Sequence, residues 1–201
     1  MKFDLPNNRT LEMHQDNGGG DSRSWDNLSQ MIFVGNYKHL GDKHNVSFDG
    51  NYNSRQEFIE EGERELKKQI KNIVVCKAVH LYSHSGETIS TSFGYPYNCR
   101  WDSGTIGFVI VTKEAIRENW GVKNVTQKLI DHAEELAVGE VNTLDQEIRG
   151  EVYSFTIENE DGETEDACGG FYGDDIKENG ILDNISEEDR KFIEESLVVS
   201  N

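Results

Sequence analysis

Four side chains with nucleophilic or acid–base chemistry lie close together in the middle of the sequence, in and before the segment 98–111. Nucleophilic catalysis needs a thiol or hydroxyl, a base that removes its proton, and a third group that orients the base. The sequence provides all three kinds of group here. The candidate catalytic residues are His84, Cys99, Asp102 and Ser103.

Other residues nearby extend this candidate set. Ser85 is a further possible nucleophile, His80 a further base, and Asp42 a further orienting carboxylate. No G-x-S-x-G turn or known cysteine-protease context surrounds them. The alternative is that 101–104 (Trp-Asp-Ser-Gly) is a hairpin turn, with Asp and Ser bonding local amides and Gly accepting positive φ. Base rates for short motifs favour the turn.

Two histidines, His80 and His84, are the candidate metal ligands, together with Asp42, His44 or Asp102. Histidines spaced i,i+4 meet on a helix, whereas 73–82 reads as a strand. No H-E-x-x-H motif or clustered carboxylate set is present. The pattern therefore favours structural histidines. The glycine-rich pieces lack the context of a phosphate-binding loop, and no calcium loop is present, so no cofactor is expected.

Strands and two long helices are expected to hold these residues in place. Near-continuous apolar runs at 73–82 and 105–111 predict paired strands at the centre of a sheet. Ser54 and Glu57 have capping-box spacing for a helix over 54–71, and a second helical spacing covers 124–149. Asp161-Gly162 predicts a hairpin between 151–157 and 163–171.

These elements predict an α+β fold: a single domain with a mostly antiparallel sheet and two main helices packed on it. The expected organisation is a loose N-terminal arm (1–23), of which 1–15 could instead be an edge strand, a core domain (24–173), and an acidic tail with a short helix (174–201). A long loop with little regular structure is expected at 35–53. The residues expected in or near the core are Trp25, Val74, Val75, Trp101, Phe108, Ile110, Leu136 and Phe155.

Charge is distributed unevenly along the chain. The formal net charge is −18, and residues 150–201 contribute −13 of it, whereas 73–112 is neutral. Such a chain is repelled by phosphate backbones and anionic lipid, which argues against direct binding to nucleic acid or membranes. The same charge suits a partner with a basic groove. Three cysteines without C-x-x-C spacing, and no apolar run of about 20 residues, predict a protein of a reducing cytoplasm.

Several blocks resemble a family of small uncharacterised proteins encoded by tailed bacteriophages, prophages and plasmids. They are 25–28 (WDNL), 40–44 (LGDKH), 81–86 (LYSHSG) and 101–104 (WDSG) with Gly107, followed by weaker blocks as far as 168–173 (CGGFYG). The resemblance implies a mobile-element origin and expression in a bacterial host, and supplies no activity. Residues 1–23 and the acidic tail lie outside it. The candidate binding residues are Trp25, Asp26, Asp42, His44 and Trp101.

Three functional hypotheses follow. The first is an acidic accessory protein that binds and inhibits or redirects a host protein with a basic surface, as in anti-restriction, anti-CRISPR or host takeover; nucleic-acid mimicry is one route. The alternative is a small hydrolase or nucleotide-processing enzyme centred on the four candidate catalytic residues. The third is a protein that sequesters a signalling nucleotide, which requires Lys43, Arg23 and Arg100 to gather in one pocket.

Overall fold

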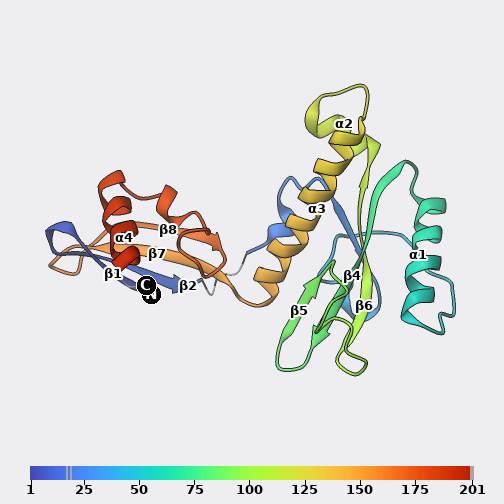
Figure 1. Ribbon diagram of the computed structural model, residues 1–201, viewed down its shortest axis with the longest axis horizontal. Helices are drawn as coiled ribbons and strands as arrows, with labels where there is room; N and C mark the ends of the chain where they lie inside the picture. Colours follow the sequence, from blue (N-terminus) through green and yellow to red (C-terminus); the bar gives the residue numbers. More distant parts are fainter. Residues whose placement is uncertain (17, 19, 200–201) are drawn as a thin grey trace. The chain divides into compact units, whose positions relative to one another are not determined.

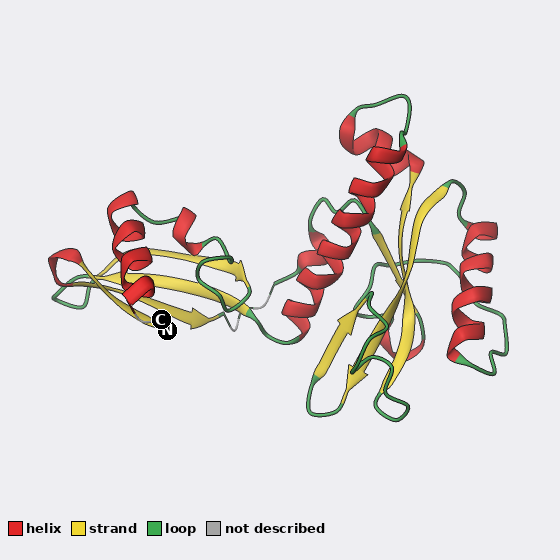
Figure 2. Cartoon of the chain, viewed as in Figure 1, coloured by secondary structure: helices red, strands yellow, loops and turns green. Residues whose placement is uncertain are grey.

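The computed structural model describes residues 1–16, 18 and 20–199, and it divides the chain into two compact units. The continuous segment 21–145 forms one of them, here called the central unit. The two ends of the chain, 1–20 and 146–201, form the other, here called the terminal unit. Each contains one four-stranded antiparallel sheet with helices, so the α+β class with antiparallel pairing is confirmed, with two sheets in place of one (Figures 1 and 2).

The sheet of the central unit has the strand order β3-β6-β4-β5. The predicted pairing of the two apolar runs is confirmed, because β4 and β6 are its two middle strands. The bounds of its elements are β3 (Gln30–Phe33), α1 (Arg55–Gln69), β4 (Ile73–Ser83), β5 (Glu87–Ser90), β6 (Ser103–Thr112), α2 (Lys113–Trp120) and α3 (Gln127–Ile148, of which 127–145 belong to this unit).

Helices α1 and α3 lie on opposite sides of this sheet (Figure 1). On the α1 side, Leu66 packs with Ile32, Phe108 and Ile110. Neighbouring strand residues alternate to the α3 side, where Lys77 forms an ion pair with Glu134 at 2.6 Å. Ser54 caps α1 by accepting a hydrogen bond from the Glu57 amide, as its capping-box spacing predicts.

The sheet of the terminal unit has the order β1-β2-β7-β8, and α4 packs on one face of it. Its core consists of residues from both chain ends, among them Leu11, Phe155 and Ile193. Arg9 donates two hydrogen bonds to the buried carboxylate of Asp189, at 2.6 and 3.1 Å. The bounds are β1 (Lys2–Leu5), β2 (Arg9–Gln15), β7 (Val152–Glu158), β8 (Thr164–Tyr172) and α4 (Glu187–Val199).

The N-terminal segment is not the loose arm that the sequence suggests. Residues 2–5 and 9–15 form β1 and β2, and β2 is an inner strand paired with β7. Leu11 and Met13 are buried because they pack against residues about 140 positions later in the chain, which complete this face of the sheet. The weak alternation around them does not identify a strand without those partners. The tail after residue 174 likewise contributes Ile176, Ile181 and Leu182 to this core.

The expected core is confirmed at four positions and wrong at three. Val75, Phe108, Ile110 and Phe155 are buried, and Val74 is half-buried. Trp25, Trp101 and Leu136 are 54%, 84% and 38% exposed. Both tryptophans lie in turns beside polar residues, where a large apolar side chain alone does not determine burial. No helix in the described ranges combines the length and the apolar character needed to cross a membrane.

Candidate functional site

The candidate catalytic residues gather at the end of the central sheet where β6 begins. His84 lies in the turn between β4 and β5, and Cys99 and Asp102 lie in the long connection from β5 to β6. The amide of Ser83 donates a 2.7 Å hydrogen bond to the carbonyl of Asp102, which holds the two turns side by side. Distant parts of the sequence are thus brought together, as a catalytic set would require.

The order of the groups does not match nucleophilic catalysis. Nδ1 of His84 lies 3.4 Å from Oδ2 of Asp102, and the thiol of Cys99 donates a hydrogen bond of 3.9 Å to the same oxygen. The carboxylate therefore stands between the thiol and the imidazole. In a working set the imidazole stands between, because it must accept the proton of the nucleophile.

Ser103 and Ser85 do not supply a better nucleophile. The hydroxyl of Ser103 donates to the carbonyl of Cys99 and accepts a 3.1 Å hydrogen bond from Arg55. Ser85 is exposed at the tip of the β4–β5 turn. The Ser103 hydroxyl thus stabilises the turn at 99–103, but it bonds a carbonyl and not an amide, and Gly104 lies in β6 without the expected positive φ.

His80 is a buried residue of β4, with 3% of its surface exposed. Its Nδ1 lies 2.9 Å from the hydroxyl of Thr105, directly opposite on β6. Burial, together with the positive charge of Arg55, lowers the pKa of His80 from 6.5 to about 4. A neutral imidazole in this place acts as a structural hydrogen-bonding group.

Asp42 and His44 are engaged with the edge strand β3. The carboxylate of Asp42 accepts hydrogen bonds from Arg23 at 2.7 and 3.1 Å and from the Met31 amide at 2.7 Å. Nε2 of His44 lies 2.8 Å from the carbonyl of Phe33. These contacts attach the loop after β3 to that strand and cover its edge, which leaves little of either side chain for a ligand.

The metal hypothesis gains no ligand set from these positions. His80 pairs with Thr105, and His84 pairs with Asp102 on the surface. Within the described ranges, no three His, Cys, Asp or Glu side chains are grouped as metal ligands. The two candidate histidines are separated, because His80 is buried on β4 whereas His84 is exposed in the β4–β5 turn.

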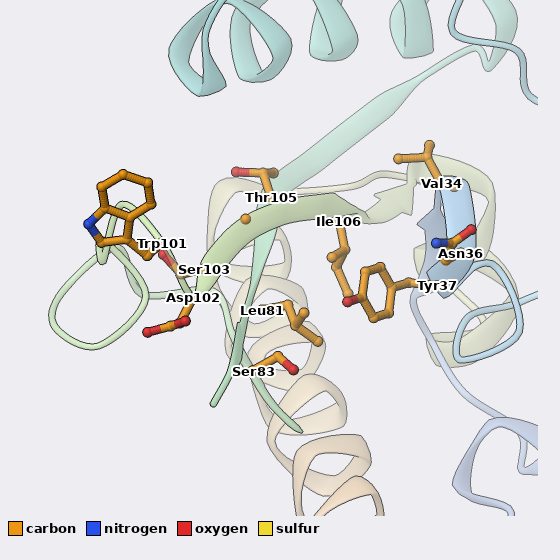
Figure 3. Close-up of a pocket in the computed structure, with 12 residues that line it drawn as sticks. Val34, Asn36, Tyr37, Leu81, Ser83, Trp101, Asp102, Ser103, Thr105 and Ile106 are labelled. Atoms are coloured by element: carbon orange, nitrogen blue, oxygen red, sulfur yellow. The ribbon is translucent and has the colours of Figure 1, made fainter. Parts of the chain in front are cut away.

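Trp101 and Asp102 line a cavity of about 390 Å³ on the α3 side of the sheet (Figure 3). The cavity is also lined by Leu81 and Ser83 of β4 and by Tyr37, which follows β3. Asp26 lines a different, more polar hollow together with residues of α2. Trp25 lies in the turn immediately before Asp26. The candidate binding residues therefore do not share one cleft.

Arg55, which the sequence pattern does not single out, is a central residue of this region. Its guanidinium donates hydrogen bonds to the carbonyls of Tyr97 and Ser103, from the first turn of α1. The rings of Phe93 and Trp101 lie under the guanidinium groups of Arg55 and Arg100, each at 5.5 Å. Lys43 and Arg100 are exposed, and Arg23 pairs with Asp42 and Glu140, so these three do not gather in one pocket.

Acidic residues are concentrated in the terminal unit. It contains twenty Asp and Glu against six Lys and Arg, a net charge of −14, which leaves −4 for the larger central unit. Strand β8 is exposed along 164–170, and it carries Glu165 and Asp166 next to the acidic β7–β8 turn. Residues 1–20 belong to the same unit as the acidic residues 146–201. Their basic residues do not outnumber their acidic ones, so they do not offset the negative charge of the unit.

The blocks that resemble a phage-encoded family lie mostly in the central unit, and several of them surround the turns at His84 and Trp101. That resemblance remains a prediction. No protein-family model, no curated protein and no solved structure matches the chain.

Proposed function

We propose that this protein is an accessory protein of a bacteriophage or related mobile element that binds a host protein through its acidic terminal unit. The observation that carries the proposal is the concentration of −14 of the −18 charges in that one unit. A compact body with this charge density attracts a basic surface strongly and repels nucleic acid.

The kind of partner follows from the same chemistry. A protein surface that normally holds DNA or RNA is rich in Lys and Arg, and a folded unit with exposed carboxylates can occupy it in place of phosphates. Binding of this kind would inhibit or redirect a host defence, replication or transcription protein in the cytoplasm. The mobile-element origin rests on the residue blocks described above.

The geometry at Asp102 supports this binding role over the enzyme alternative. The nucleophile and the base both contact the carboxylate, and no hydrogen bond joins the imidazole of His84 to Cys99 or Ser103 within the described residues. A protein without a working nucleophile can still act by occupying a surface.

The test compares two variants of equal net charge. The first neutralises four exposed carboxylates of the terminal unit: Asp161→Asn, Glu165→Gln, Asp166→Asn and Glu195→Gln. The second, a matched control, neutralises four exposed carboxylates of the central unit: Glu60→Gln, Glu118→Gln, Asp131→Asn and Glu135→Gln. Tagged wild-type and variant proteins are purified from infected host cells, and the proteins that copurify are quantified.

We expect the wild type and the central-unit variant to retain the same host protein, and the terminal-unit variant to lose most of it. The amount of host protein that copurifies should fall as salt is raised, because salt screens the charge attraction. Double-stranded DNA should compete with the tagged protein, because it occupies the same basic surface. Equal retention by both variants, or no protein specific to the wild type, would contradict the proposal.

A further inference from the structure

A second cavity, of about 460 Å³, lies on the α1 side of the central sheet, between the start of α1 and the start of β6. Its volume is in the range of small-molecule sites. Aromatic rings form one wall, and hydroxyl groups of β6 and a guanidinium form the other. The residues that matter are Phe48, Tyr52, Phe58, Arg55, Ser103 and Thr105.

The aromatic wall is fixed by packing, although much of it comes from a loop. Residues 38–54 contain no helix or strand, yet Phe48 stacks on Phe108 of β6 at 6.0 Å. The Tyr52 ring meets Phe58 edge-on at 5.0 Å, and its hydroxyl donates a 2.9 Å hydrogen bond to Glu65. The long loop at 35–53 therefore places two rings against the helix and holds them there.

Arg55 brings a positive charge to this cavity without a carboxylate to balance it. Its guanidinium donates only to neutral acceptors, the carbonyls of Tyr97 and Ser103 and the hydroxyl of Ser103. Within the described part of the chain, no carboxylate forms an ion pair with it. Six of the eight arginines do form such pairs, namely Arg9, Arg23, Arg64, Arg117, Arg149 and Arg190.

An unbalanced, half-buried charge is unusual in a chain with 38 acidic residues. The buried imidazole of His80 experiences it, since the Arg55 charge contributes to the lowered pKa of His80. A guanidinium offers five N–H donors, and the Nε–H of Arg55 makes no hydrogen bond within the described residues. The cavity thus combines an unsatisfied cationic donor with a flat aromatic wall.

We propose that this cavity binds a small molecule whose anionic group, a carboxylate or a phosphate, is attached to a flat ring. The anion would pair with Arg55, since charge-assisted hydrogen bonds to a guanidinium are strong and directional. The ring would pack on Phe58 and Tyr52, as offset or edge-to-face aromatic pairs do. Aromatic acids and nucleotides share this chemistry.

This inference is independent of the proposed function, because the cavity lies in the central unit and the acidic surface in the terminal unit. Either can fail without the other. The protein would then bind a small molecule through its central unit in addition to a host protein through its terminal unit.

The test is an NMR titration of the full-length protein with defined probes. Benzoate and adenosine monophosphate each carry a ring and an anion, inorganic phosphate carries only the charge, and benzyl alcohol carries only the ring. We expect benzoate or adenosine monophosphate to shift the amides of 54–58 and 103–105, with about ten-fold weaker binding of the two single-feature probes. Which of the two ring-bearing anions binds more tightly distinguishes a carboxylate from a phosphate ligand.

Three variants locate the interaction. Arg55→Gln removes the charge and should weaken binding about ten-fold, whereas Arg55→Lys keeps the charge and should weaken it less. Arg100→Gln is the control: it removes the same charge from an exposed arginine that does not line this cavity. Its binding should equal that of the wild type.

Unchanged affinity in Arg55→Gln would overturn the proposal. If that variant does not fold, the wild-type titration still decides, because shifts absent from 54–58 and 103–105, or confined to other parts of the chain, contradict the site. Equal binding of benzyl alcohol and benzoate would also contradict it, since the anion would then contribute nothing.

Discussion

At the residue scale, His80 shows how burial changes the chemistry of a side chain that looks catalytic in the sequence. The imidazole is enclosed between β4, β6 and the Phe93 ring, whose centroid lies 5.0 Å away. The groups that face it are the hydroxyl of Thr105 and the positive charge of Arg55. Burial and the positive charge of Arg55 both favour the neutral imidazole, so His80 is not protonated near neutral pH.

A pH dependence of stability follows from this shift. The pKa of His80 is about 4 in the folded protein and 6.5 for an unperturbed imidazole, so the unfolded chain binds the proton first. The stabilisation is complete above about pH 6.5 and is lost as the pH falls towards 4, by an amount on the order of 3 kcal/mol. Urea unfolding at several pH values, compared with His80→Asn, measures it.

The Asn variant cannot take up this proton, so its free energy of unfolding should fall less steeply over the same pH range. Parallel pH profiles for the wild type and the variant would show that other groups dominate the acid sensitivity. The comparison uses slopes, which removes any constant cost of the substitution itself.

The remaining reactive residues divide by what surrounds them. Burial raises the pKa of the Cys76 thiol to about 12, so this cysteine is unreactive at neutral pH. Cys99 and Ser103 are hydrogen-bonded within the turn that precedes β6. Residue type alone predicts a catalytic set here, whereas the partners of each side chain indicate a stabilised turn.

At the element scale, β6 depends on a close approach to β3. Gly107 lies opposite Phe33 and has φ +154°, next to a register shift in the pairing of β4 with β6. A Cβ at this position would overlap the carbonyl oxygen of Ile32 and lie 2.7 Å from the Cα of Phe33. The irregularity changes the direction of the strand start, so that Ser103 and Thr105 face α1 while Gly104 faces α3.

Substitution of Gly107 by alanine should therefore be severe. We expect Gly107→Ala to cost about 3 kcal/mol or more, because the backbones of β3 and β6 must move apart to admit the new Cβ. The matched control is Gly104→Ala on the same strand, where no atom lies within 4 Å of the new Cβ and the cost should stay below about 1 kcal/mol. Thermal and urea unfolding measure both variants, and similar midpoints for the two would contradict this account.

At the scale of the whole molecule, the two units differ in how the chain builds them. The central unit is one continuous segment, whereas the terminal unit pairs β2 from the first residues with β7 from the last third. Its core needs both ends, since Leu11 and Met13 pack with Phe155 and Ile193. Charge follows the same division, with −14 in the terminal unit.

This organisation predicts how fragments behave. Residues 21–145 expressed alone should fold, with helical and strand circular dichroism and a cooperative thermal transition, because their buried core is complete within the segment. Residues 146–201 alone should not, because β7 loses its inner partner and half of the core is missing. A disordered 21–145 fragment, or a cooperatively folded 146–201 fragment, would contradict the division.

The local features of this protein could be predicted from its residues alone. The strands 73–82 and 105–111, the cap at Ser54, the hairpin at Asp161-Gly162 and the short helix of the acidic tail are all present near the expected residues. Each depends on contacts between residues near one another in the chain, or on a long apolar run that has few alternative structures. The concentration of acidic charge is likewise readable from composition.

The other features depend on packing between segments that are distant in the chain. The N-terminal strands, the exposure of Trp25 and Trp101, and the isolated charge of Arg55 beside an aromatic wall all depend on residues far away in the sequence. Periodicity and residue type describe the preference of one segment. Which segments become neighbours depends on the packing of the whole chain, and packing determines whether a polar side chain stabilises a turn or is available to a ligand.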